Sequence, residues 1–150
     1  MNNKHQINSL TIANMQASAR KLAKTLKPGD VILLEGEVGA GKTTFARALI
    51  EEISIEPCEV TSPTFNLMQS YDVKDANGKD ATLWHLDLYR LKSPEEAQEL
   101  GLDDIWQHIV LIEWAGIIED LIPPNYIKIK IDLVANPEQR TLTIIYPQES

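Results

Sequence analysis

The chain contains 150 residues, of which 43% are hydrophobic and 24% are charged, a composition typical of one soluble globular domain spanning residues 1–150. Its 14 Lys and Arg residues against 22 Asp and Glu residues give a formal net charge of −8, which disfavours tight and direct binding of RNA or DNA. The single cysteine excludes an internal disulfide, and the histidines lack the spacing of a zinc site. We therefore expect a protein of a reducing, cytoplasmic compartment.

The apolar runs of the chain are too short for insertion into a membrane. The longest, residues 31–34 and 109–112, contain four residues each, whereas a membrane-spanning helix needs about 20. The N-terminal residues are polar and carry no recognisable export signal. We expect neither a membrane-spanning segment nor a membrane partner.

The first half of the chain predicts a helix, a strand and a second helix. Apolar residues three and four positions apart predict a helix over residues 13–26. Residues 31–34 are wholly apolar, which is typical of a strand buried on both faces in a parallel sheet. A glycine-rich loop follows in residues 36–41, and the sequence turns helical from Lys42.

The second half of the chain predicts the remaining strands of the same sheet. They are expected at residues 65–71, 81–88, 110–112, 127–133 and 141–146. Asn77 and Gly78 are a hairpin turn signal between the first two strands, and Ser93, before a proline and two acids, predicts the start of a short helix. The predicted fold class is α/β, with a mixed, mostly parallel sheet flanked by helices and with antiparallel hairpins.

The glycine-rich loop carries the strongest chemical signal. Residues 36–43 read GEVGAGKT and match the pattern G-x-x-x-x-G-K-[ST], between a strand and a helix as its mechanism requires. The glycines let backbone N–H groups surround a phosphate chain, and the helix N-terminus adds partial positive charge. Lys42 could reach the β- and γ-phosphate oxygens, and Thr43 could offer its hydroxyl to Mg²⁺. The pattern predicts a P-loop NTPase fold.

Such a loop needs an acid that holds the magnesium ion or orients water. Asp87 and Glu113 each end a predicted apolar strand, so each could reach the phosphate site at the carboxyl edge of the sheet. The alternative for either acid is a helix cap or a surface role. Which of the two would touch the metal is left open.

Ser62 and Thr64 lie between the P-loop helix and the next strand, where P-loop NTPases place a loop that senses the γ-phosphate. A Ser-Pro turn before a strand is the alternative reading. His85 is interpreted as a satisfied histidine within a strand. Arg90 could pair with Asp87 or act as a phosphate cation. The three tryptophans are interpreted as packing residues, one of which could line a nucleotide or partner surface.

Five segments together resemble the bacterial TsaE (YjeE) family. They are GEVGAGKTT at residues 36–44, SPTF at 62–65, HLDLYRL at 85–91, ELGL at 99–102 and IEW at 112–114. The resemblance covers about residues 10–132, and the second and third segments are much more specific than the P-loop alone. Glu37 stands where the family commonly has Asp, and the segment after Ile131 matches weakly.

The resemblance implies an ATPase of low intrinsic activity that acts with TsaB and TsaD in making threonylcarbamoyladenosine in tRNAs reading codons that begin with A. In that family the carbamoyl transfer belongs to TsaD, and the ATPase is an accessory or regulatory subunit that hydrolyses ATP to ADP and phosphate. The acidic composition predicts that any tRNA contact is made through the partners.

The resemblance also implies roles for individual residues. Residues 11–14 would form part of the adenine pocket, and Ser62 and Thr64 would form the nucleotide-sensing loop. Catalysis would rest on Lys42, Asp87 and Glu113, and Mg²⁺ on Thr43, Glu113 and Asp87. The ATP-binding residues would be Gly36, Gly39, Ala40, Gly41, Lys42, Thr43, Thr44, Ser62 and Thr64.

Three other functions are weighed against this ATPase. A small-molecule kinase usually needs a lid with several arginines, and the four arginines of this chain form no cluster. A GTP-dependent switch usually has an Asn-Lys-x-Asp motif after a late strand, and here only an incomplete match occurs, near the N-terminus. A scaffold that binds ATP without useful hydrolysis is the third alternative.

Overall fold

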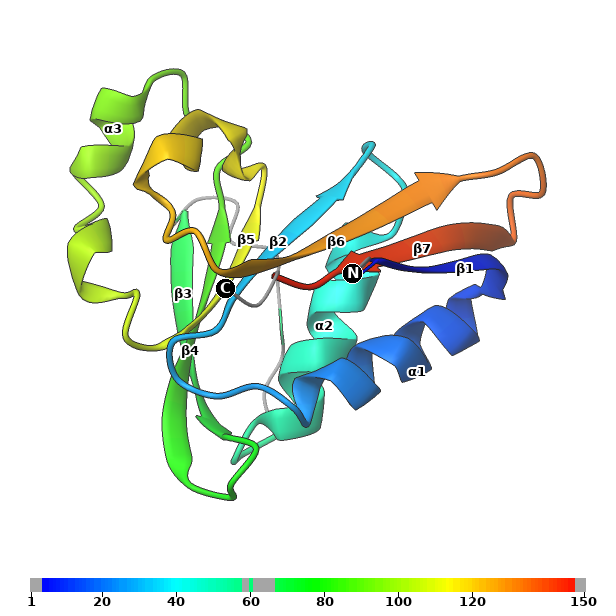
Figure 1. Ribbon diagram of the computed structural model, residues 1–150, viewed down its shortest axis with the longest axis horizontal. Coiled ribbons are helices and arrows are strands. Elements are labelled where there is room, and N and C mark those ends of the chain that lie inside the picture. Colours follow the sequence, from blue (N-terminus) through cyan, green and yellow to red (C-terminus); the bar gives the residue numbers. More distant parts are fainter. Residues whose placement is uncertain (1–3, 58–59, 61–66, 148–150) are drawn as a thin grey trace.

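The computed structural model describes residues 4–57, 60 and 67–147 (Figure 1). Within these ranges the strands form one seven-stranded sheet of order β1-β7-β6-β2-β5-β4-β3. The strands are β1 (Lys4–Thr11), β2 (Val31–Gly36), β3 (Met68–Lys74), β4 (Asp80–Asp87), β5 (Ile109–Glu113), β6 (Tyr126–Leu133) and β7 (Gln139–Ile145). The helices are α1 (Ile12–Ala23), α2 (Lys42–Ile53) and α3 (Pro94–Gln98), with the 3₁₀ segments η1 (Leu102–Asp104) and η2 (Ala115–Leu121).

The centre of the sheet is parallel and its two sides are antiparallel. Strand β2 pairs in parallel with both β5 and β6, and β4 pairs in parallel with β5. Strands β1 and β7 extend the sheet antiparallel on one side, and β3 does so on the other. This arrangement confirms the predicted α/β class and the mixed sheet. It brings the carboxyl ends of β2, β4 and β5 to one edge.

Helices α1 and α2 cover one face of the sheet, which we call the two-helix face (Figure 1). Side chains alternate along β2, so Ile32 and Leu34 point to this face. They meet Phe45 and Leu49 of α2, which are both completely buried. This packing fixes α2, whose first residue is Lys42, against the central strand.

The opposite face is covered by α3, η1 and η2, and we call it the short-helix face (Figure 1). Val31 and Leu33 of β2 point to this side and pack with Ala97 and Leu102. Because apolar side chains cover β2 from both sides, the wholly apolar run of the sequence is explained.

Most element predictions are confirmed, with four differences. Helix α1 ends at Ala23 rather than at residue 26. Strand β1 was not predicted, because its side chains are almost all exposed and show no apolar pattern. Its backbone pairs with β7 instead. Strand β3 begins at Met68, and the first two residues of the predicted strand, 65 and 66, lie outside the described residues. It ends at Lys74 rather than at residue 71, because the turn that joins it to β4 is tight and Asp75 accepts hydrogen bonds from Asn77 N and Lys79 N. The two 3₁₀ segments were also not predicted.

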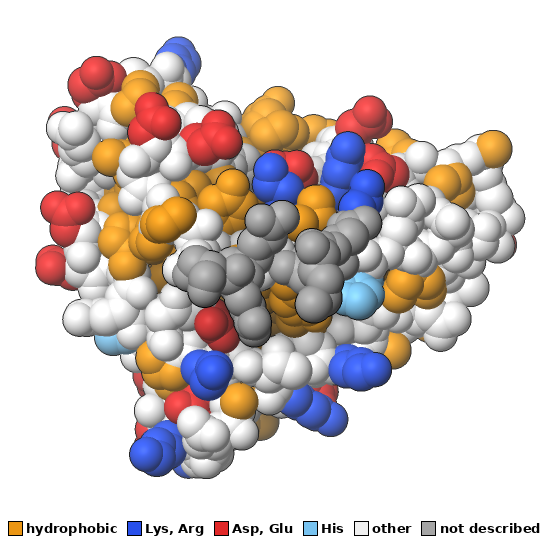
Figure 2. Space-filling view, viewed as in Figure 1, with side chains coloured by type: hydrophobic (Ala, Val, Ile, Leu, Met, Phe, Trp, Pro, Cys, Tyr) orange, Lys and Arg blue, Asp and Glu red, His pale blue; other side chains and the backbone are white. Residues whose placement is uncertain are grey.

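Charge is distributed unevenly over the surface. A group of exposed acidic residues lies on and beside α3 and η1, at the left of Figure 2. Its members are Glu95, Glu96, Glu99, Asp103 and Asp104.

Among the residues that the structure describes, no helix is both long and apolar enough to cross a membrane.

Candidate nucleotide-binding site

The glycine loop, residues 36–41, joins β2 to α2 and requires glycine at two positions. A Cβ atom at Gly36 would lie 2.7 Å from the carbonyl oxygen of Ile131, because the strand runs directly beside β6 there. Gly41 caps α2 in the left-handed conformation, with a φ of 111°, which L side chains rarely adopt. These two glycines let the chain turn sharply from the end of the strand into the helix.

A cavity of about 350 Å³ opens at the N-terminus of α2. Its lining residues are Val38, Gly39, Gly41, Lys42, Thr43, Thr44, Asp87, Glu113 and Trp114. Gly36 lines an adjoining cavity of about 260 Å³, and Ala40 is buried beneath the loop. Ser62 and Thr64 lie outside the described residues. The structure therefore gathers most of the predicted phosphate-binding residues with both predicted acids, while their roles stay predictions.

The two acids come together because of the strand register. Asp87 of β4 is the direct partner of Glu113 of β5 in the parallel ladder. Side-chain alternation along β4 puts Asp87 on the same side as Leu83, and along β5 it puts Glu113 on the same side as Leu111. Both of those leucines belong to the two-helix face. The carboxylates are therefore carried toward the N-terminus of α2.

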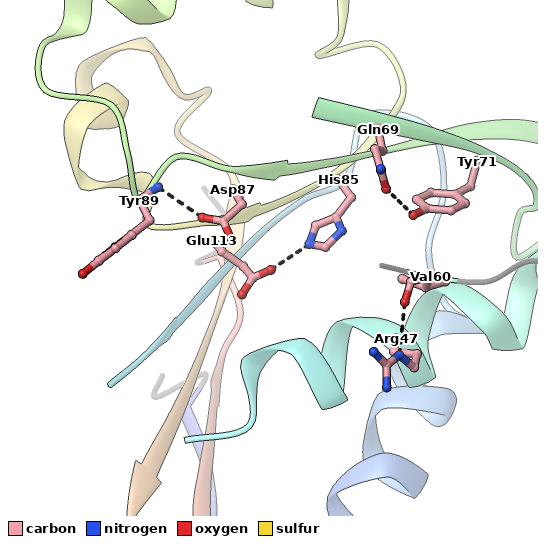
Figure 3. A network of polar contacts seen from close by, with 8 residues as sticks. All are labelled: Arg47, Val60, Gln69, Tyr71, His85, Asp87, Tyr89 and Glu113. Carbon is pink, nitrogen blue, oxygen red and sulfur yellow. Dashed lines mark hydrogen bonds and ion pairs between the residues drawn. The ribbon is translucent and has the colours of Figure 1, made fainter. Parts of the chain in front are cut away.

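Glu113 is held by a histidine from the neighbouring strand (Figure 3). His85 Nε2 lies 2.8 Å from Glu113 Oε2, and the two side chains are only 1% and 3% exposed. An ionised carboxylate only accepts hydrogen bonds, so with ionised Glu113 this contact assigns the proton to Nε2 as donor. His85 Nδ1 is buried and has no hydrogen-bond partner among the described residues. The prediction that the ring nitrogens of His85 have hydrogen-bond partners is therefore confirmed for Nε2 and not for Nδ1.

Asp87 is more open than Glu113 and is braced by the backbone. Its Oδ1 accepts a hydrogen bond from Tyr89 N at 3.1 Å (Figure 3). This hydrogen bond stabilises the turn directly after β4 and holds the carboxylate beside Glu113. The side chain is half-buried and lines the cavity.

Lys42 points into the cavity and is covered by an aromatic side chain. Its ammonium nitrogen lies 3.5 Å from the ring centroid of Trp114, and only 7% of the residue is exposed. The Trp114 ring in turn packs against Tyr89, with ring centroids 4.8 Å apart. Burial lowers the pKa of Lys42, while the charges of Glu113 and Asp87 act in the opposite direction.

Trp114 is a cavity residue whose position the sequence did not single out from the other tryptophans. It follows β5 directly and has a φ of 57°, a left-handed conformation uncommon for a bulky residue. Such backbone strain costs about 1–3 kcal/mol and tends to occur at functional sites. The sequence feature that could have identified Trp114 as a cavity residue is its position directly after Glu113, which ends a predicted strand.

The oxygen-bearing side chains of the cavity fit a hard divalent cation. Thr43 brings a hydroxyl and Asp87 and Glu113 bring carboxylates, and all three line the same space. Mg²⁺ prefers oxygen donors and usually takes one or two carboxylates together with substrate phosphates and water. Among the described residues, no group of three or more His, Cys, Asp or Glu side chains is arranged to hold a metal ion. The hydroxyl and the two carboxylates are oxygen donors of the type that Mg²⁺ prefers.

The chain is similar to proteins of the TsaE family. The family model "Threonylcarbamoyl adenosine biosynthesis protein TsaE" matches residues 10–142. The tRNA threonylcarbamoyladenosine biosynthesis protein TsaE of Rickettsia felis is 41% identical over 141 residues, which cover 91% of this chain and 79% of the relative. The protein of the same name from Bacillus subtilis is 38% identical over 126 residues, which cover 83% and 75%.

A solved structure agrees with these sequence matches. The crystal structure of Bacillus subtilis YdiB superposes with a TM-score of 0.77 at 29% identity. The superposition covers 99% of this chain and 88% of YdiB. The antiparallel strands at the two sides of the sheet are thus included along with the parallel centre. Since the family match extends over most of the chain and the fold agrees, this protein belongs to the TsaE family.

Proposed function

We propose that this protein is an ATPase of tRNA threonylcarbamoyladenosine biosynthesis, which binds ATP with Mg²⁺ in the cavity at the N-terminus of α2. The observation that carries the proposal is the meeting of Lys42, Asp87 and Glu113 in one cavity beside the glycine loop. The names of the relatives support the pathway.

Binding would rest on the glycine loop and on α2. The first N–H groups of a helix have no partner within the helix, so those at the start of α2 are available to phosphate oxygens. The partial positive charge of the helix end adds to the charge of Lys42. Phosphate oxygens would give the buried ammonium group of Lys42 charge-assisted hydrogen bonds.

Hydrolysis would use the carboxylates of β4 and β5. Water attacks the γ-phosphorus, the bond to the bridging oxygen breaks, and ADP and phosphate are the products. A carboxylate, Asp87 or Glu113, orients the water and accepts its proton, and Lys42 stabilises the charge that develops on the phosphoryl oxygens. Bound Mg²⁺ would neutralise charge on the β- and γ-phosphate oxygens.

Within the pathway the protein would act as an accessory subunit beside TsaB and TsaD. The net charge of −8 and the acidic group around α3 and η1 oppose direct contact with tRNA. We therefore assign tRNA contact to the partner proteins, with this chain supplying ATP hydrolysis.

The decisive experiment compares Lys42→Ala with the exposed control Lys21→Ala. We expect Lys42→Ala to abolish slow ATP hydrolysis and Lys21→Ala to leave it unchanged, with ATP turnover altered when TsaB and TsaD are added. Hydrolysis should be measured in single-turnover and steady-state assays. Unchanged hydrolysis in Lys42→Ala would contradict the site. ATP binding without hydrolysis, with or without the partners, would favour a scaffold instead.

A further inference from the structure

Arg140 of β7 places its guanidinium group among four backbone carbonyls. Its Nη1 donates to Pro137 O at 2.8 Å and to Gln139 O at 2.7 Å, which fixes the side chain against its own hairpin. Its Nε donates to Ala40 O at 2.8 Å, and its Nη2 donates to Gly39 O at 3.4 Å. The last two carbonyls belong to the glycine loop, 100 and 101 residues earlier in the chain.

These hydrogen bonds determine which way the peptide groups of the loop point. In a trans peptide the carbonyl and the following N–H point in opposite directions, and the described chain contains no cis peptide. When Arg140 holds the Ala40 carbonyl, the N–H of Gly41 must point away from Arg140. Gly41 lines the cavity, so under the proposed function this N–H would be available to a phosphate oxygen. A cation on the carbonyl also polarises the peptide and strengthens this N–H as a donor.

The other restraints on this conformation are the burial of the Ala40 side chain in the core of the two-helix face and a turn inside the loop. Gly39 and Gly41 have φ values of 86° and 111°, and glycine loses more conformational freedom on ordering than other residues. Ala40 N donates to Glu37 O at 3.0 Å and closes a turn inside the loop. Arg140 ties this turn to β7, a strand that pairs on both sides, with β1 and with β6.

We propose that Arg140 is a positioning residue that holds the glycine loop in its phosphate-binding conformation. The proposal rests on the proposed function, because it concerns the loop that would bind ATP. Its physical content is preorganisation, since a loop ordered before binding loses less entropy when phosphate arrives.

The first test is nucleotide affinity of Arg140→Ala and Arg140→Lys, with the exposed Arg20→Ala as a matched control. Dissociation constants for ATP, ADP and pyrophosphate should be measured at a temperature at which all variants are folded. We expect Arg140→Ala to weaken all three by about tenfold to a hundredfold, the range for losing charge-assisted hydrogen bonds. Arg140→Lys, which can reach one carbonyl, should recover part of the loss. A lower melting temperature with affinities within about twofold of wild type would overturn the proposal.

The second test does not need nucleotide. Amide hydrogen exchange measured by NMR should be faster for the Ala40 N–H in Arg140→Ala than in wild type, because the turn between Ala40 and Glu37 loses its anchor. The Phe45 N–H, which donates to Gly41 O, serves as the control, and its exchange should be unchanged. Equal exchange at Ala40 in both proteins would contradict the positioning role. If wild type fails to bind ATP while Ala40 responds as expected, the proposed function fails and the anchoring of the loop stands.

Discussion

The two faces of the sheet are covered in different ways. Helices α1 and α2 have twelve residues each, and they bury a continuous apolar layer on the two-helix face. On the short-helix face the covering segments have three, five and seven residues. Large aromatic side chains there stay partly exposed, among them Trp84, Trp106 and Trp114.

The candidate site lies where these two coverings meet. Lys42 begins α2 on the two-helix face, whereas Trp114 packs against the core of the short-helix face. The approach of the Lys42 ammonium to the Trp114 ring joins them across the end of the sheet. The glycine-loop part of the candidate site thus belongs to the face with long helices, and its aromatic cover belongs to the face with shorter segments.

Truncating a buried leucine on each face tests this contrast and should have the largest effect. Leu49 of α2 is completely buried and Leu102 of η1 is 5% exposed, so the same side chain is removed from a buried position on each face. Leu→Ala changes cost about 2–5 kcal/mol, more where the surroundings cannot collapse into the cavity. We expect Leu49→Ala at the upper end of this range and Leu102→Ala at the lower end, measured by urea unfolding. Equal losses of stability would show that the short-helix face is packed as rigidly as the other.

Replacing Lys42 by methionine tests whether the buried ammonium group of the candidate site lowers the stability of the fold. Because burial lowers the folded-state pKa of Lys42 below 10.5, the unfolded chain binds more protons between the two pKa values, and stability rises with pH in that window. Below both pKa values the folded protein carries the whole cost of burying the ammonium group. We expect Lys42→Met to be more stable than wild type at pH 7 by about 0.5–2 kcal/mol, as for other functional groups held at a cost to stability.

The advantage of Lys42→Met should shrink as the pH approaches 10.5, where the lysine is neutral in a growing fraction of molecules. Urea unfolding of both proteins at about pH 7 and about pH 10 measures the difference, and the same variant should lose nucleotide binding. A Lys42→Met protein less stable than wild type at neutral pH would show that Glu113, Asp87 and the Trp114 ring together outweigh the burial of the ammonium group.

The sequence predicted the parts of the fold that follow from apolar pattern and local turn chemistry. Residues 31–34 indicated a strand that is packed against other elements on both faces, because all four side chains are apolar, and all four are buried in β2. Ser93 indicated a helix cap, and its hydroxyl accepts a hydrogen bond from Glu96 N. Strand β1 could not be found this way, because its place depends on backbone pairing with β7 and its side chains are mostly exposed.

The candidate site was predictable where its residues end strands and not where they act from a distance. Asp87 and Glu113 could be named because carboxyl ends of parallel strands share an edge, and the register makes them direct partners. Arg140 reaches the loop across 100 positions of sequence through carbonyl oxygens, which every residue has. No residue type marks such an acceptor, so pattern alone does not reveal it. The position of Trp114 after a predicted strand is visible in the sequence, whereas its left-handed backbone, which accompanies the contact with Lys42, is not.

Replacing Trp84 by phenylalanine should have the smallest effect, and it tests how tightly the short-helix face is specified. The indole Nε1 of Trp84 is buried and has no hydrogen-bond partner among the described residues. An unsatisfied buried donor costs about 1–3 kcal/mol. Removing this donor should therefore offset most of the stability that is lost because phenylalanine buries less apolar surface than tryptophan. We expect Trp84→Phe to change the free energy of unfolding by less than about 1 kcal/mol. The matched control, Trp106→Phe, should lower the free energy of unfolding further, because it reduces apolar burial without removing an unpaired donor. A destabilisation above about 2 kcal/mol for Trp84→Phe would mean that the indole N–H has a partner, and that this face is specified by polar interactions as well as by packing.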